Sequence, residues 1–132
     1  MARPLRIEYE GAFYHITSRG NERKRIFFGK GDYDKFKEYL QEAQDKFGYR
    51  LLCYVLMSNH YHLLIETPNG NMSRVVHYIN GSYTNYVNRK RNRSGHLLGK
   101  SMGTLFNNLI QCRQQEWRIG AEGGDYHLKN SY

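Results

Sequence analysis

The chain has 132 residues, with 20 Lys and Arg against 12 Asp and Glu, and therefore a net charge of +8. A hydrophobic content of 39% with 12 Tyr and 6 Phe excludes a disordered chain, and two cysteines exclude both a disulfide framework and a four-cysteine zinc site. The N-terminus carries no apolar signal segment, and the longest apolar run, Leu51 to Met57, is far shorter than the roughly 20 residues of a membrane span. We therefore expect one soluble, cytoplasmic domain with no membrane partner.

The first half of the chain predicts a strand, a helix and a hairpin. Aromatic and β-branched residues from Ala12 to Arg19 are typical of a strand. Asp32 is the expected N-cap of a helix whose apolar positions repeat at helical spacing until Gly48 closes it. A short apolar strand, Arg50 to Met57, then turns through two residues into a partner strand, His60 to Glu66.

A second amphipathic helix follows and completes the pattern. Its apolar stripe consists of Met72, Val75, Val76, Ile79, Tyr83 and Tyr86. The order is strand, helix, strand, strand, helix, with room for one more strand. This order predicts a ferredoxin-like α+β fold, an antiparallel sheet with two helices on one face.

Two basic clusters dominate the charge pattern. They are residues 19–25 and 89–93, and all of the excess charge lies within the first hundred residues. Basic side chains next to Asn and Tyr suit a phosphate backbone, because each neutralised phosphate releases counterions. The alternative is that both clusters are solvated loops that keep the protein soluble. We favour nucleic acid, and Lys24, Arg89 and Arg91 are candidate contacts.

A pair of histidines indicates a metal site. His60 and His62 are two residues apart on a predicted strand, so both side chains point to the same face. Two imidazoles are too few for a closed structural site, so this pair would hold a divalent metal with open positions for substrate. Taken alone, the pattern is more often ordinary packing. We expect the other histidines to be structural or solvated: His15, His77, His96 and His127.

Three segments together resemble the single-tyrosine HUH transposases, and most closely those associated with repetitive extragenic palindromes. The segments are Tyr14 to Asn21 (YHITSRGN), Met57 to Leu64 (MSNHYHLL) and Ser94 to Leu97 (SGHL). The resemblance covers about residues 5–99. It divides the chain into a transposase-like domain, residues 1–100, and a divergent tail, residues 101–132.

The resemblance implies a ferredoxin-like domain that binds single-stranded DNA, usually next to a hairpin. His60 and His62 match the metal-binding pair, which in the family holds Mg²⁺ or Mn²⁺ against the scissile phosphate. A tyrosine then attacks the phosphorus and gives a 5′-phosphotyrosine intermediate that is rejoined without ATP. Arg19, Asn21 and Arg23 match the basic loop that we assign to DNA.

The tail departs from the family pattern after residue 99. No strand is recognisable from Ser101 to Thr104, and no tyrosine-bearing helix follows, as expected of a truncated or frameshifted product. Tyr126 with Asn130 has the family spacing of nucleophile and third metal ligand, and one helical turn would place both on one face. We therefore predict Tyr126 as catalytic and Asn130 as a metal ligand. Elsewhere in the tail, Leu105, Leu109 and Cys112 indicate only a weak helical face.

Several alternatives remain at this stage. Tyr83 and Tyr86, and after them Tyr78, are secondary candidates for the nucleophile, although core packing is the better explanation for Tyr83 and Tyr86, which lie on the helical stripe. The chain is either an active enzyme or a catalytically dead module that binds single-stranded or hairpin DNA. A metal-dependent phosphodiesterase that uses water is a third hypothesis. Homodimer formation is a further alternative, since a missing last strand would expose a sheet edge.

Overall fold

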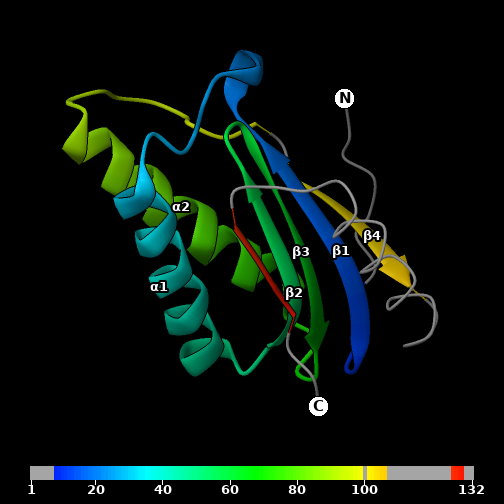
Figure 1. The fold of residues 1–132 in the computed structure, drawn as a ribbon. Coiled ribbons are helices and arrows are strands. Elements are labelled where there is room, and N and C mark those ends of the chain that lie inside the picture. Colours follow the sequence, from blue (N-terminus) through cyan, green and yellow to red (C-terminus); the bar gives the residue numbers. More distant parts are fainter. Residues whose placement is uncertain (1–7, 100, 107–125, 130–132) are drawn as a thin grey trace.

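The computed structural model describes residues 8–99, 101–106 and 126–129, which form one sheet with two helices packed on one of its faces (Figure 1). In chain order the elements are β1 (Ala12–Arg19), the short 3-10 helix η1 (Asn21–Arg23), α1 (Lys30–Phe47), β2 (Arg50–Met57), β3 (His60–Thr67), α2 (Met72–Lys90), β4 (Met102–Phe106) and β5 (Tyr126–Lys129). The strand order is β4-β1-β3-β2-β5, and all neighbours are antiparallel. The first four strands have the ferredoxin-like order, so the predicted α+β fold is confirmed.

Strand β3 lies at the centre of the sheet, and its alternating residues divide between two faces. Tyr61, Leu63 and Ile65 are buried in the cluster that includes the helices. His60 and His62 alternate with them and therefore point to the other side. We call the side packed by α1 and α2 the helix face and the opposite side the histidine face.

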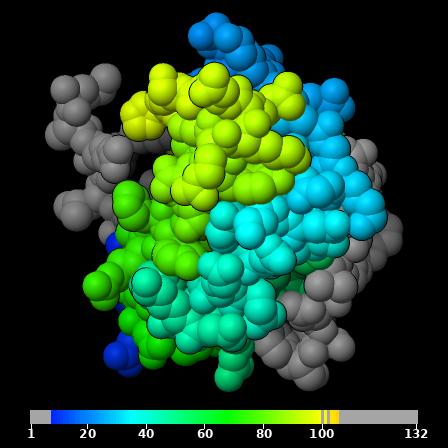
Figure 2. Space-filling model, turned by 90° about the vertical axis from the view of Figure 1, so that its left-hand side faces the viewer, coloured from blue at the N-terminus to red at the C-terminus, as the bar shows by residue number. Residues whose placement is uncertain are grey.

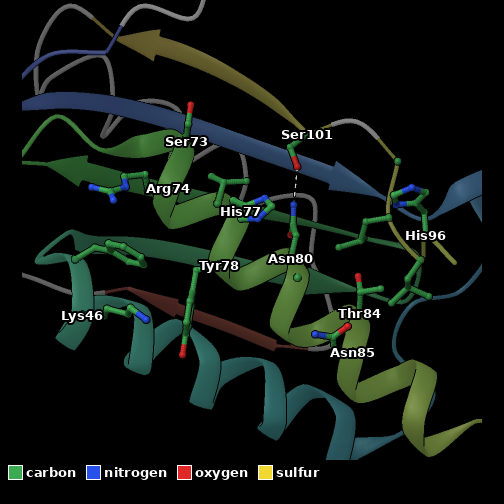
Figure 3. Close-up of a pocket in the computed structure, with 16 residues that line it drawn as sticks. Lys46, Ser73, Arg74, His77, Tyr78, Asn80, Thr84, Asn85, His96 and Ser101 are labelled. Atoms are coloured by element: carbon green, nitrogen blue, oxygen red, sulfur yellow. Dashed lines mark hydrogen bonds between the residues drawn. The ribbon is translucent and has the colours of Figure 1, made fainter. Parts of the chain in front are cut away.

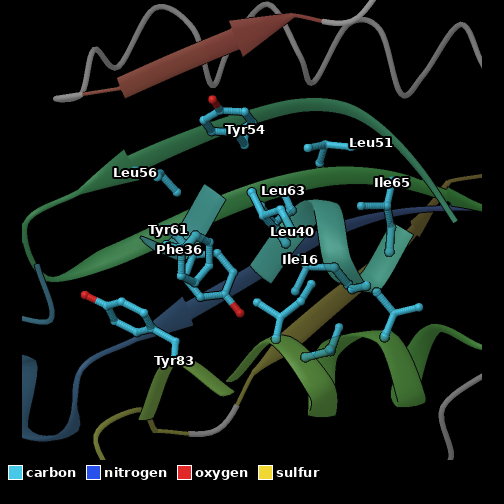
Figure 4. Packing of buried hydrophobic residues seen from close by; sticks show 14 of the residues in the cluster. Ile16, Phe36, Leu40, Leu51, Tyr54, Leu56, Tyr61, Leu63, Ile65 and Tyr83 are labelled. Atoms are coloured by element: carbon cyan, nitrogen blue, oxygen red, sulfur yellow. The ribbon is translucent and has the colours of Figure 1, made fainter. Parts of the chain in front are cut away.

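The main hydrophobic core fills the space between the sheet and the two helices (Figure 4). Aromatic rings form its centre: Phe36 of α1 lies 4.9 Å from the ring of Tyr61 and 5.2 Å from that of Tyr83, measured between centroids. All three side chains are fully buried. Such pairs add to the burial of apolar area and lock α1 and α2 against β3.

The ends of the helices are set by local polar contacts. Helix α1 begins at Lys30 after Gly29, two residues before the predicted cap, and Asp32 lies in its first turn. There the Asp32 carboxylate accepts a hydrogen bond from the backbone N–H of Phe28, which explains why the position resembled a cap. The predicted stop is confirmed, since Gly48 has the left-handed φ of 71° that ends a helix.

Strands β4 and β5 correct the interpretation of the tail. No strand was recognisable from Ser101 to Thr104, yet all but the first of these residues belong to β4. This strand pairs with β1 from Phe13 to Thr17. Leu105 lies in this strand, so its assignment to a weak helical face is wrong. Strand β5 pairs with β2 at the other edge. The sheet therefore continues past the predicted boundary at residue 100 and has neighbours for both β1 and β2. Leu109 and Cys112 lie outside the described residues.

Candidate functional site

The histidine pair lies at the start of β3, on the histidine face. The ring centroids of His60 and His62 are 5.0 Å apart, and the ring planes are nearly perpendicular at 83°. His62 is almost buried at 9% exposure, whereas His60 is half-buried. The rigid central strand thus holds two imidazoles side by side, as the spacing predicted.

His60 is oriented by the residue that precedes it. Its Nδ1 lies 2.8 Å from Oδ1 of Asn59, in the two-residue turn between β2 and β3. Because an amide oxygen only accepts hydrogen bonds, Nδ1–H of His60 is the donor, and the lone pair of the ring lies on Nε2. The amide nitrogen of Asn59 donates to the backbone carbonyl of Arg23, 3.3 Å away, which fixes the orientation of this amide.

His62 is in contact with a third histidine that the sequence interpretation regarded as structural or solvated. Nε2 of His15, on β1, lies 2.9 Å from Nδ1 of His62, and their rings stack with centroids 5.1 Å apart. Thr17 Oγ1 is 3.3 Å from both of these nitrogen atoms. Burial and, secondarily, the neighbouring His62 lower the pKa of His15 to about 4, so His15 is neutral at neutral pH.

The first basic cluster adjoins the histidine pair. Arg19 pairs with His60 across β1 and β3, and the chain then turns through η1, where Glu22 and Arg23 have positive φ angles of 56° and 59°. Gly20 is required at this turn, because a Cβ there would lie 2.1 Å from the carbonyl oxygen of Lys24. The structure therefore brings the predicted DNA-binding residues Arg19 and Arg23 to the same end of the sheet as the histidines.

The Ser-Gly-His-Leu segment holds this basic loop in place. Asn21 donates two of the hydrogen bonds that link them. Its backbone N–H donates to the carbonyl of Leu97 and its side-chain amide donates to the carbonyl of His96, both at 3.0 Å. Gly99 N–H donates to the carbonyl of Arg19 at 2.7 Å. The first and third sequence motifs are therefore one structural unit, and the side chain of Asn21 is part of this framework.

The second basic cluster lies at the C-terminal end of α2, at the same end of the molecule as η1 (Figures 1 and 2). Its members are not equally available to a ligand. Lys90 forms an ion pair with Asp32 at 2.9 Å, and the guanidinium of Arg91 lies 3.9 Å above the ring of Phe28. Arg89 is exposed. Lys24, in the first cluster, is exposed and lies 3.8 Å from Glu22.

The predicted helical turn that would join Tyr126 to Asn130 is wrong. Tyr126–Lys129 is strand β5, whose backbone pairs with β2 and is not helical. Tyr126 is in register with Leu56, the residue paired with Tyr61, whereas His127 is in register with Val55, the residue paired with His62. Across the sheet, the backbone position of Tyr126 is therefore aligned with that of Tyr61 and not with that of His62. Asn130 lies outside the described residues.

The secondary tyrosine candidates are on the other side of the molecule. Tyr83 is fully buried in the helix-face core, and its hydroxyl donates to the carbonyl of Ile26 at 2.6 Å. Burial raises the pKa of Tyr83, which disfavours the phenolate. Tyr86 packs against the same core and donates to Asp32, and the Tyr78 hydroxyl donates to Glu42. For Tyr83 and Tyr86, the core-packing alternative is confirmed.

A groove of about 1140 Å³ runs along α2, between this helix and residues 96–101 (Figure 3). Arg74, His77 and Asn85 line it from α2, and His96 faces them from the opposite wall. Asn80 donates to Ser101 across its floor at 2.8 Å. Among the residues that the structure describes, none of those predicted to bind DNA or metal lines this groove.

Within residues 8–99, 101–106 and 126–129, no group of three or more His, Cys, Asp or Glu side chains could hold a metal ion. A metal held by the described residues would therefore have at most two side-chain ligands of these types. Neither α1 nor α2 is long and apolar enough to cross a membrane.

The fold and this site define the class: a ferredoxin-like α+β protein with a histidine pair on the sheet face opposite its helices. The family model described as Transposase IS200 like matches residues 8–108, so the chain belongs to the IS200-like transposase family. This confirms the resemblance seen in the sequence. The sequence matches none of the curated proteins.

Solved structures share the fold. A REP-associated tyrosine transposase bound to a REP hairpin superposes with a TM-score of 0.77 at 13% identity, covering 92% of this chain and 72% of that one. A protein from Deinococcus radiodurans R1, described as a candidate transposase, gives 0.60 at 16% identity over 93% and 99% of the two chains. The tRNA(His) guanylyltransferase of Saccharomyces cerevisiae gives 0.55 at 10% identity over 90% and 62%. At these identities the likeness concerns the fold alone.

Proposed function

We propose that this chain is a cytoplasmic, transposase-like endonuclease and strand transferase for single-stranded DNA, in which His60 and His62 hold a divalent metal and Tyr126 is the nucleophile. The observation that carries the proposal is the placement of the histidine pair beside Arg19 and Arg23 at one end of an IS200-like transposase fold. A DNA hairpin next to the cleaved strand is the proposed partner, in line with the hairpin-bound structural neighbour. Homodimer formation stays a prediction.

The residues present fit a divalent metal that accepts both nitrogen and oxygen ligands. Two imidazoles project from the same face of β3, and the lone pair of the His60 ring lies on Nε2 because Nδ1–H donates to Asn59. Imidazole nitrogen suits Mn²⁺ better than Mg²⁺, which prefers oxygen ligands. Either metal would need oxygen donors in addition to the two histidines. Asn130 remains the proposed oxygen donor from the protein. When bound, such a metal polarises the scissile phosphate as a Lewis acid.

The chain's own groups carry the remaining chemistry. The tyrosine oxygen attacks phosphorus, the bond from phosphorus to the 3′ oxygen breaks, and that oxygen takes up a proton to leave a 3′-hydroxyl and a 5′-phosphotyrosine. Attack by a second 3′-hydroxyl reverses the exchange. Arg19 and Arg23 bind the DNA backbone, and Asn21, Lys24, Arg89 and Arg91 extend this surface. In the structure the backbone of Tyr126 pairs with that of Leu56.

The test is covalent capture. The purified chain is incubated with labelled single-stranded DNA from the flanks of its own gene and with Mn²⁺, and the products are separated on a denaturing gel. We expect a protease-sensitive shifted band that is lost in Tyr126→Phe, His60→Ala and His62→Ala and kept in Tyr9→Phe, a change at an exposed tyrosine. A band that persists in Tyr126→Phe would disprove that assignment, and mass spectrometry of the adduct would identify the tyrosine used.

A second candidate function is favoured by the register of β5. The backbone of Tyr126 pairs with Leu56 and not with Val55, the partner of His62, and this register favours a module that binds single-stranded or hairpin DNA without cutting it. That function predicts a native mobility shift without a covalent band. Repeated cleavage without any adduct would instead support the water-dependent phosphodiesterase.

A further inference from the structure

We infer that His15 is a positioning residue for the histidine pair: its Nε2 accepts a hydrogen bond from Nδ1–H of His62 and so leaves Nε2 of His62 as the metal-binding atom. The inference rests on the proposed function for the metal, whereas the hydrogen bond can be measured without it.

The sheet register brings the two rings together. His15 pairs with Leu64 across β1 and β3, so His62 is its diagonal neighbour on the same face. The 2.9 Å contact between Nε2 of His15 and Nδ1 of His62 has room for one proton. Either His62 donates to His15, which leaves the lone pair of His62 on Nε2, or His15 donates to His62, which puts a hydrogen there and blocks a metal.

The neighbouring His60 favours the first arrangement. Its Nδ1–H donates to Asn59, so its lone pair lies on Nε2. With the same proton placement in His62, both histidines of the pair present the same atom, and each is held at Nδ1 by a residue outside the pair. Histidine ligands of metals generally donate their other ring N–H to such an acceptor, which fixes both the tautomer and the ring orientation.

His15 is suited to this supporting role and not to that of a third ligand. Its Nε2 is engaged with His62, and among the described residues no group of three His, Cys, Asp or Glu side chains could hold a metal. The hydroxyl of Thr17, 3.3 Å from both nitrogen atoms, both donates and accepts and so suits either partner.

The first measurement is the tautomer of His62 in the metal-free chain. Long-range ¹H–¹⁵N correlation spectra of the full chain near pH 7.5 are expected to show His62 protonated at Nδ1. Protonation at Nε2 would overturn the inference, whatever the metal does.

The second measurement is Mn²⁺ affinity, followed by the electron paramagnetic resonance of the free ion. His15→Phe keeps a ring but removes the acceptor, and we expect it to weaken binding by about 10- to 100-fold. His15→Gln, whose amide oxygen can accept from His62, should recover part of the loss. His77→Phe is the matched control, because His77 is exposed on α2, and it should bind as the wild type does.

The outcomes separate this inference from the proposed function. Lost Mn²⁺ binding in His62→Ala with unchanged binding in His15→Phe overturns the role of His15 and leaves the proposed function standing. A wild-type chain that binds no Mn²⁺ overturns the metal site of the proposed function, and with it the metal-binding part of this inference. If His15→Phe does not fold by circular dichroism, the wild-type tautomer and the His15→Gln affinity decide.

Discussion

The two faces of the sheet are made from alternate residues of the same strands, yet they are built for different purposes. On the helix face, Tyr61 and Leu63 are buried among the side chains of α1 and α2. On the histidine face, His60 and His62 meet other polar side chains, namely Asn59, His15 and Thr17. A smaller apolar cluster, around Val55 and Leu64, lies on this second face.

The comparison shows how one strand can serve stability and chemistry at once. Packing on the helix face and backbone pairing with β1 and β2 fix the position of β3. The imidazole of His60 on its other face is therefore held in place without having to contribute much to stability itself. Polar groups at precise positions, which would be costly in a core, can be placed there.

The largest expected effect on stability compares the two faces of β3 at two adjacent residues. Tyr61→Ala should lower the free energy of unfolding by about 3 to 5 kcal/mol, because it opens a cavity among Phe36 and Tyr83 and removes the hydroxyl that donates to Asn80. His60→Ala should lower it by about 1 kcal/mol or less. Urea unfolding followed by circular dichroism measures both. Equal losses would show that the histidine face carries as much stability as the helix face.

A smaller, pH-dependent effect is expected from the polar contacts at the end of the helix layer. Burial alone would raise the pKa of Asp32, but hydrogen bonds from Lys90, Tyr86 and the Phe28 backbone outweigh it and lower the pKa. The stability that the carboxylate provides is present above the unfolded pKa near 4 and is lost as the pH falls through the lower folded value.

Asp32→Asn should therefore cost about 2 kcal/mol at pH 7, and the difference from the wild type should shrink as acid protonates the wild-type carboxyl. Urea titrations at several pH values measure it. The exposed pair of Asp34 and Lys30 is a matched control, and Asp34→Asn should change stability much less than Asp32→Asn, because water screens this ion pair. A difference for Asp32→Asn that stays constant down to pH 2 would contradict the ionic explanation.

The smallest effect on stability, with a clear effect on binding, is expected at the basic end of the sheet. Arg19 and Arg23 are exposed, so replacing both by Ala should change the free energy of unfolding by about 0.5 kcal/mol or less. Each lost phosphate contact should reduce the slope of log affinity for single-stranded DNA against log salt by about 0.7. Lys37→Ala, on α1, is the control. An unchanged slope would remove both arginines from the interface.

The fold was largely predictable because its central elements have strong local signals. The alternation in β1, the short turn between β2 and β3, and the helical apolar stripes are all visible in the sequence. Strand β4 was missed because it has only five residues and the second of them, Gly103, gives no strand signal. Glycine at this position is explained by a long-range contact, since a Cβ at Gly103 would lie 3.2 Å from the side chain of Ile16 on β1.

The candidate site was predictable in part for similar reasons. The spacing of His60 and His62 was sufficient to place both on one face. The partnership of His15 with His62 was not, because alternation gives the face of β1 but not its register against β3. The helix expected at Tyr126 failed because pairing with Leu56 of β2, 70 residues earlier in the chain, determines the backbone there.

The two-residue turn between β2 and β3 also bears on the order in which the site is assembled. Hairpins between adjacent strands form within about 1–10 μs, since little loop entropy is lost in closing them. His60, His62 and Asn59 all belong to this hairpin, whereas His15 joins only when β1 docks across more than 40 intervening residues. We therefore expect the hairpin that carries His60 and His62 to form during folding before β1 brings His15 next to His62.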